Sequence, residues 1–186
     1  MKKDLIVFID CGDTLVDEST QIMNENGDVL RADMIEGARE MLTGLYNDGY
    51  RIALVADGRV VSFHNIFREL DLEYIFEEWI ISEALGCEKP DTRMFSTAME
   101  RMDLTDEDKN HIVMIGNNIK RDVLGANQMG ITSILLSFSP RYVMQPEAEM
   151  EVPEYVVSMP CELTPLLEQL NIQVRTKKIL KKSTKV

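Results

Sequence analysis

The chain has 186 residues, of which 45% are hydrophobic and 28% are charged, a balance typical of one globular domain with a sizeable core. No apolar run is long enough to span a membrane, and the apolar stretch near the N-terminus is too short for a secretory signal. Three cysteines without metal-type spacing favour a cytoplasmic protein with free thiols.

The net charge of −12 is unevenly distributed along the chain. Six basic residues and no acidic ones lie between positions 175 and 186, which leaves about −18 on the remainder. Such a body repels nucleic acid, so we expect no nucleic-acid partner. We expect a single domain over residues 1–172 and a basic C-terminal tail over residues 173–186. The tail either binds an acidic partner or is a solvated helix end or frayed terminus, and we favour the latter reading.

The first predicted strand is the apolar run LIVFI, which leads directly into Asp10 and then turns through Gly12. A short apolar run ended by a turn is typical of a strand buried on both faces. A carboxylate at the C-terminal end of such a strand lies where ligands bind, and it can attack phosphorus as a nucleophile. Aspartate is also a common strand-ending turn residue, so this stretch alone leaves both interpretations open.

Strands and helices alternate along the rest of the chain. Asn26 and Gly27 predict a hairpin turn within a short flap over residues 16–33. Further strands are predicted at 51–56, 78–82, 111–116, 132–137 and 155–157. Helices are predicted at 34–47, 60–70, 91–102 and 162–170, and one more follows the strand at 111–116 and ends at Met129. This alternation predicts an α/β fold, a three-layer Rossmann-like parallel sheet with helices on both faces.

Polar side chains follow the ends of the buried strands. Asp10, Asp57, Asn117 and Asp122 all come directly or shortly after such an end, so we expect them to converge on one edge of the sheet. Lys89 lies in a loop that can reach the same edge. Core packing does not explain why acidic side chains, an amide and a lysine would gather at this edge. Their clustering therefore indicates a functional site.

These segments resemble the haloacid dehalogenase (HAD) superfamily from Leu5 to about Leu136. The family's four motifs correspond here, in order, to DCGDTL, RIALVADG, EKPD and IGNNIKRDVLGANQMG. The resemblance implies a hydrolase, most simply a phosphatase, with Asp10 as the catalytic nucleophile. It implies that Lys89 assists catalysis by holding the phosphoryl group and the nucleophile together. Substrate contacts are expected from Asp57, Gly58 and Lys89.

The resemblance also implies a Mg²⁺ cofactor, because hard oxygen ligands suit that ion. The expected metal ligands are the carboxylates of Asp10 and Asp122, the carbonyl of Gly12 and the side chain of Asn117.

Three positions depart from the family pattern. Gly12 stands where the family's phosphatases carry a second aspartate, their general acid/base, and losing such a group typically costs ~10²–10⁴ in rate. Asp13 substitutes only if the turn is rearranged. Ala56 removes a hydroxyl that would bind the phosphoryl group, and Asn117 replaces a metal-binding aspartate. The alternative to a phosphatase of reduced activity is a non-catalytic binding or regulatory protein that keeps the fold.

Too little chain lies between the motifs for a large cap domain. An open site suits a phosphoprotein, or a phosphorylated small molecule enclosed by the neighbouring subunit of a homo-oligomer. The loop over residues 139–153 is a further candidate wall.

The cysteines offer a rival reading that we reject. Cys87 and Arg93 have the C-x5-R spacing of cysteine phosphatases, but Pro90 removes a backbone donor and two nearby acids oppose a thiolate. Cys11 should point into the core by strand alternation.

Overall fold

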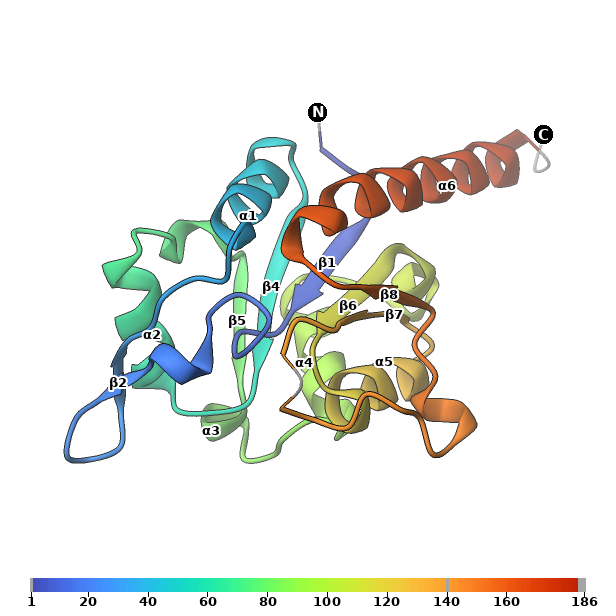
Figure 1. Ribbon diagram of the computed structural model, residues 1–186. Helices are drawn as coiled ribbons and strands as arrows, with labels where there is room; N and C mark the ends of the chain where they lie inside the picture. The colour runs from blue at the N-terminus through green and yellow to red at the C-terminus, as the bar shows by residue number, and fades with distance from the viewer. Residues whose placement is uncertain (1, 140, 184–186) are drawn as a thin grey trace.

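The computed structural model describes residues 2–139 and 141–183. Its centre is a six-stranded sheet in the order β5-β4-β1-β6-β7-β8, and every neighbouring pair is parallel (Figure 1). The strands are β1 (Ile6–Ile9), β4 (Arg51–Ala56), β5 (Glu78–Ile81), β6 (Ile112–Gly116), β7 (Thr132–Leu136) and β8 (Tyr155–Val157). The predicted α/β parallel sheet is therefore confirmed.

Helices cover both faces of the sheet. On one face lie α1 (Ala38–Asn47), α2 (Val60–Glu69) and α6 (Leu163–Ser183), and on the other α4 (Thr92–Arg101) and α5 (Leu124–Met129). In β1, Val7 and Ile9 join the first core while Ile6 and Phe8 join the second, because successive side chains of a strand point to opposite faces. This explains the continuous apolar run of the sequence, and it makes the fold three-layered.

Short elements connect these layers. The one-turn helix α3 (Ser82–Leu85) follows β5, and a single π-helical segment (Ile119–Val123) precedes α5. Turns of 3-10 helix lie at Glu18–Thr20, Glu73–Ile75, Asp106–His111, Glu149–Glu151 and Pro160–Glu162. In the part of the chain that the structure describes, no helix combines the length and apolarity needed to cross a membrane.

A small hairpin, rather than a cap domain, projects beside the sheet (Figure 1). Its strands β2 (Ile22–Met23) and β3 (Val29–Arg31) pair antiparallel around the predicted Asn-Gly turn. Helix α2 anchors it, because Ser62 accepts the Val29 N–H at 3.0 Å and Asn65 donates to the Val29 carbonyl at 3.0 Å. The segment over residues 16–33, which we call the flap, is thus fixed to the body of the protein.

Two predicted helix bounds are wrong. Helix α1 begins at Ala38 rather than near residue 34, because Ile35 donates its N–H to Leu15 and Gly37 adopts a left-handed φ of 79°. The last helix does not end near Leu170 but continues to Ser183. Leu170 and Val174 are buried, so the core extends the helix into the predicted tail. The end of that tail, residues 184–186, lies outside the described residues.

Candidate active site

The strand order places three polar turns side by side. Strand β1 lies between β4 and β6, and Asp57, Asp10 and Asn117 each come one residue after the end of one of these strands. The N–H of Asp10 continues the pairing of β1 with β6 by donating to the Ile115 carbonyl at 2.9 Å. The expected convergence of these residues on one edge of the sheet is confirmed.

Lys89 is buried at the centre of this edge. Its Nζ lies 2.7 Å from Asp10 Oδ1 and 2.7 Å from Asp122 Oδ1, and it donates to the Val55 carbonyl at 2.8 Å. Burial alone would lower the pKa of Lys89, but attraction to Asp10, Asp122 and Asp57 outweighs it and raises that pKa. The ammonium group therefore stays charged and joins the two carboxylates.

Asp122 reaches the site from the π-helical segment. The Asn118 N–H donates to its Oδ2 at 3.0 Å. Gly116 makes this approach possible, since a Cβ at that position would lie 2.2 Å from the Asp122 carboxylate. Burial raises the pKa of Asp122 more than its attraction to Lys89 lowers it. A buried carboxylate of this kind favours a nearby cation.

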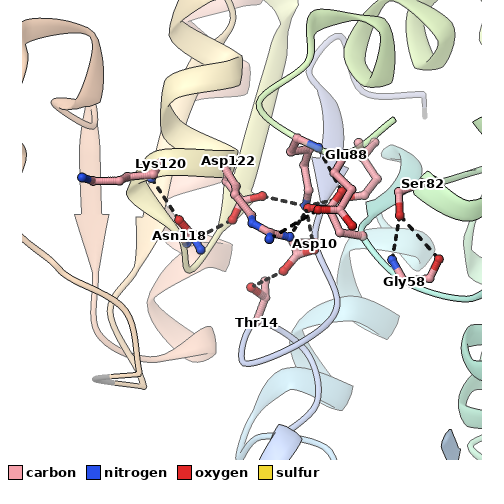
Figure 2. A network of polar contacts seen from close by, with 12 residues as sticks. Asp10, Thr14, Gly58, Ser82, Glu88, Asn118, Lys120 and Asp122 are labelled. Carbon is pink, nitrogen blue, oxygen red and sulfur yellow. Dashed lines mark hydrogen bonds and ion pairs between the residues drawn. The ribbon is translucent and has the colours of Figure 1, made fainter. Parts of the chain in front are cut away.

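Asp57 enters the site, whereas Gly58 does not. Asp57 Oδ1 accepts the backbone N–H of Lys89 at 3.0 Å, and its Oδ2 is bound by Arg121 at 3.1 Å. Gly58 instead donates its N–H to Ser82 Oγ at 2.9 Å (Figure 2) and lines a separate hollow beside α3. The structure thus brings Asp57 to Lys89 but leaves the predicted substrate contact from Gly58 outside the cavity.

A cavity of about 50 Å³ opens between these groups, enough for more than one water-sized group. Sequence reasoning missed Glu18, Arg121 and Tyr142 among its walls. Tyr142 comes from the loop over residues 139–153, which was expected as a candidate wall. The lining comprises Asp10, Gly12, Glu18, Asp57, Lys89, Asn117, Asn118, Arg121, Asp122 and Tyr142.

Glu18 occupies the space beside Gly12. A Cβ built on Gly12 would lie 1.9 Å from Glu18 Oε1. Burial raises the pKa of the Glu18 carboxyl, and Arg141 binds its Oε2 at 2.8 Å. Asp13 does not line the cavity, because its Oδ1 accepts the Glu18 N–H at 3.0 Å and its Oδ2 pairs with Arg141 at 2.8 Å. No sequence pattern indicates that Glu18 belongs to the site, because the position of Glu18 depends on how the flap folds back.

The donor set fits a Mg²⁺ ion. Asp10 and Asp122 meet at one lysine, and Gly12 and Asn117 line the same cavity. Asn117 is buried, and among the described residues its amide nitrogen has no hydrogen-bond partner; rotating the amide would present its oxygen instead. No cluster of three His, Cys, Asp or Glu suited to a metal occurs in residues 2–139 and 141–183. Mg²⁺ commonly uses only one or two carboxylates together with substrate phosphate.

The cysteines lie outside this chemistry, as expected. Arg93 pairs with Asp91 at 2.7 Å, and Cys87 lines the hollow beside α3 rather than the Asp10 cavity. Cys11 is buried in the core, and that burial raises the pKa of its thiol well above the usual range. These contacts favour neither thiol as a nucleophile.

Comparisons with known proteins point to one family. Residues 9–136 match the model of the haloacid dehalogenase-like hydrolases. A glyceraldehyde 3-phosphate phosphatase of Pyrococcus furiosus is 28% identical over 136 residues, which cover 73% of this chain and 54% of that protein. The chain spans about half the length of the curated relatives it matches.

Solved structures share the fold. A HAD phosphatase from Thermococcus onnurineus superposes with a TM-score of 0.70 at 15% identity, covering 90% of this chain and 98% of that one. A HAD-hydrolase from Bacillus subtilis, solved bound to magnesium, has a TM-score of 0.64 at 22% identity and covers 73% of this chain and 56% of that one. With the family model matching most of the chain, the protein belongs to the haloacid dehalogenase-like hydrolase family of enzymes.

Proposed function

We propose that the protein is a Mg²⁺-dependent phosphatase that works through an aspartyl phosphate on Asp10. The observation that carries this proposal is the Asp10 carboxylate, which stands at the end of the central strand and is paired with the buried ammonium of Lys89 at 2.7 Å. A carboxylate can attack phosphorus to form an acyl phosphate, and phosphoryl transfer is catalysed mainly by positioning and charge stabilisation.

The cavity residues divide this work. Lys89 holds Asp10 in place and presents positive charge to the phosphoryl oxygens as a point cation. Asp57 orients Lys89 through the lysine's backbone N–H and holds Arg121 at the cavity wall. Arg121 is therefore placed to bind the remaining charge of a phosphate ester.

Asp10, Asp122, Asn117 and the Gly12 carbonyl would hold the Mg²⁺ ion. When bound, Mg²⁺ neutralises charge that develops on the phosphoryl oxygens. The Asn118 N–H and the Lys89 ammonium hold the Asp122 carboxylate in the cavity.

The substrate that we propose is a phosphorylated small molecule. The cavity is small and polar, and similar curated proteins are phosphatases of a three-carbon phosphate. A phosphoprotein is the second candidate, since among the described residues no inserted domain stands over the cavity, whose outer wall includes Glu18 of the flap and Tyr142. A homo-oligomer in which a neighbouring subunit encloses the substrate remains part of the proposal.

Hydrolysis of an aryl phosphate and of glycerol phosphate, with and without Mg²⁺, tests this function. We expect Mg²⁺-dependent release of phosphate, abolished by EDTA and by Asp10→Asn. Asp48→Asn, on the exposed end of α1, is the matched control and should keep full activity.

Two results would contradict the proposal. Full Mg²⁺-dependent turnover in folded Asp10→Asn would exclude the aspartyl phosphate. A folded wild-type protein that hydrolyses neither ester at saturating Mg²⁺ would favour the non-catalytic, ligand-binding alternative.

A further inference from the structure

The cavity contains a carboxyl group that the first motif does not supply. Gly12 has no side chain, yet the place of its missing Cβ is taken: Glu18 Oε1 lies 1.9 Å from that point and the Glu18 carboxyl carbon 2.8 Å from it. Glu18 and Asp10 line the same cavity. A carboxylate from the flap thus fills the volume that a side chain two residues beyond the nucleophile would occupy.

Contacts with residues near Gly12 and with Arg141 hold the Glu18 carboxylate in place. The Glu18 N–H donates to Asp13 Oδ1 at 3.0 Å, and Asp17 caps the 3-10 turn that Glu18 begins. Arg141 binds Glu18 Oε2 at 2.8 Å and so leaves Oε1 as the oxygen nearest Gly12. A backbone anchor and a side-chain anchor on one residue are the kind of support that a positioned catalytic group needs.

The other carboxylates of the cavity wall already have different roles. Asp10 is the proposed nucleophile. Asp57 receives the Lys89 N–H and the Arg121 guanidinium, and Asp122 is bound by Lys89 and the Asn118 N–H. Among the carboxylates that line the cavity, Glu18 is left for proton transfer.

We propose that Glu18 is the general acid and base of the reaction, in place of a residue at position 12. This rests on the proposed phosphatase function. In the first step Asp10 forms a bond to phosphorus, the ester P–O bond breaks, and the Glu18 carboxyl gives its proton to the departing oxygen. In the second step Glu18 takes a proton from water as the water oxygen attacks phosphorus. The bond to Asp10 then breaks, releasing inorganic phosphate.

Leaving-group dependence in Glu18→Gln tests the assignment, because an aryl ester needs little protonation and an alkyl ester needs more. We expect kcat/KM for glycerol phosphate to fall by about 10²-fold, while kcat/KM for the aryl ester changes by less than about threefold. Because the second step also loses its base, the aryl ester should give a burst of about one equivalent of phenol. Glu25→Gln, in the exposed hairpin turn, is the matched control and should behave as wild type.

Moving the carboxyl back to position 12 provides the second test. Gly12→Asp alone must displace the Glu18 carboxylate, so it replaces one acid by another. We therefore expect little change in kcat/KM for the alkyl ester. Glu18→Ala empties the space and should lose alkyl activity. Gly12→Asp combined with Glu18→Ala should recover at least about tenfold over Glu18→Ala alone. Gly12 does not have a positive φ, so its backbone accepts the new side chain.

The outcomes separate this inference from the function on which it rests. Wild-type protein without Mg²⁺-dependent activity on either ester would end both. Wild-type activity together with a Glu18→Gln variant that keeps its alkyl-to-aryl ratio and gives no burst would overturn the role of Glu18 alone, and the phosphatase proposal would stand.

Discussion

Lys89 shows at the scale of one residue how strongly this site depends on a single positive charge. Its Nζ contacts the carboxylates of Asp10 and Asp122, and all three side chains are buried or nearly so. Attraction between buried groups is strong, but a buried charge without a partner is costly. The site is therefore stable only as a complete set.

Lys89→Met should lower the free energy of unfolding by about 3–5 kcal/mol in the absence of metal, because two close carboxylates lose their common partner. This difference in unfolding free energy between the variant and the wild type should shrink as the pH falls toward about 5. Burial already raises the pKa of Asp122, and loss of the attraction to Lys89 raises it further, so the folded protein binds a proton that the unfolded chain does not, and lower pH restores stability. Urea denaturation at pH 8 and pH 5 measures both effects.

Lys120→Met is the matched control for this variant. Lys120 pairs with Glu147 on the surface, and its side chain is half exposed. An exposed pair contributes up to about 1 kcal/mol, without the same pH dependence. Equal unfolding free energies for wild type and Lys89→Met would show that the carboxylates do not need Lys89.

At the scale of elements, the anchoring of the flap on α2 determines where Glu18 lies. Ser62 is buried and accepts the Val29 N–H at 3.0 Å, while Arg59 donates to the Asn26 carbonyl at 2.7 Å. These bonds join β3 and the hairpin turn to a helix that packs on the sheet. The flap therefore behaves as part of the body.

Ser62→Ala should destabilise the protein by about 1–3 kcal/mol, because it leaves the Val29 N–H without its acceptor. Amide exchange at Val29 should accelerate, since this N–H would open with the flap. Ser96→Ala, on the exposed face of α4, is the control and should change stability by less than about 0.5 kcal/mol. Unchanged exchange at Val29 would mean that the flap is held by other contacts.

The elements also show what the sequence could and could not predict. Strands β1, β4 and β6 were predictable because both faces are buried and the apolar runs are continuous. The length of α6 was not, because its second half combines basic residues with widely spaced apolar ones. Its extension follows from the burial of Leu170 and Val174 against the core, a tertiary effect.

Some residues of the candidate site were likewise predictable from the sequence, and others were not. Residues at strand ends, such as Asp10 and Asn117, were predictable because parallel strands end at one edge. For Arg121, the only indication in the sequence was its position next to Asp122. Glu18 offered none, because a side chain that arrives from a flap depends on how that flap folds.

At the scale of the whole molecule, ion pairs connect the two ends of the chain and set its response to acid. Hydrogen bonds from basic side chains lower the pKa of Asp4, Glu77 and Glu168. Two of the three pairs, Lys3 with Glu168 and Lys178 with Asp4, join α6 to the segment before β1. Acid should therefore weaken the attachment of the last helix.

The melting temperature should be lower at pH 3 than at pH 6. A lowered carboxyl pKa means that the unfolded chain binds more protons than the folded one. The stability is therefore present above about pH 4.5 and is lost as the pH falls through the folded pKa values. Calorimetry at both pH values measures the shift, and added salt should reduce it because these pairs are partly exposed. An unchanged melting temperature would show that the pairs do not stabilise the fold.

The central position of β1 has a consequence for how the protein is made. β1 is synthesised before its partners β4 and β6, which begin at residues 51 and 112. The side chain of Asn171 in α6, which accepts from the N–H groups of Asp4 and Leu5, comes later still. At about 5–20 residues per second, the ribosome needs several seconds to supply β6 after β1. During that interval one edge of an apolar strand is unpaired, and nascent chains that stop before residue 112 should bind chaperones more than longer ones.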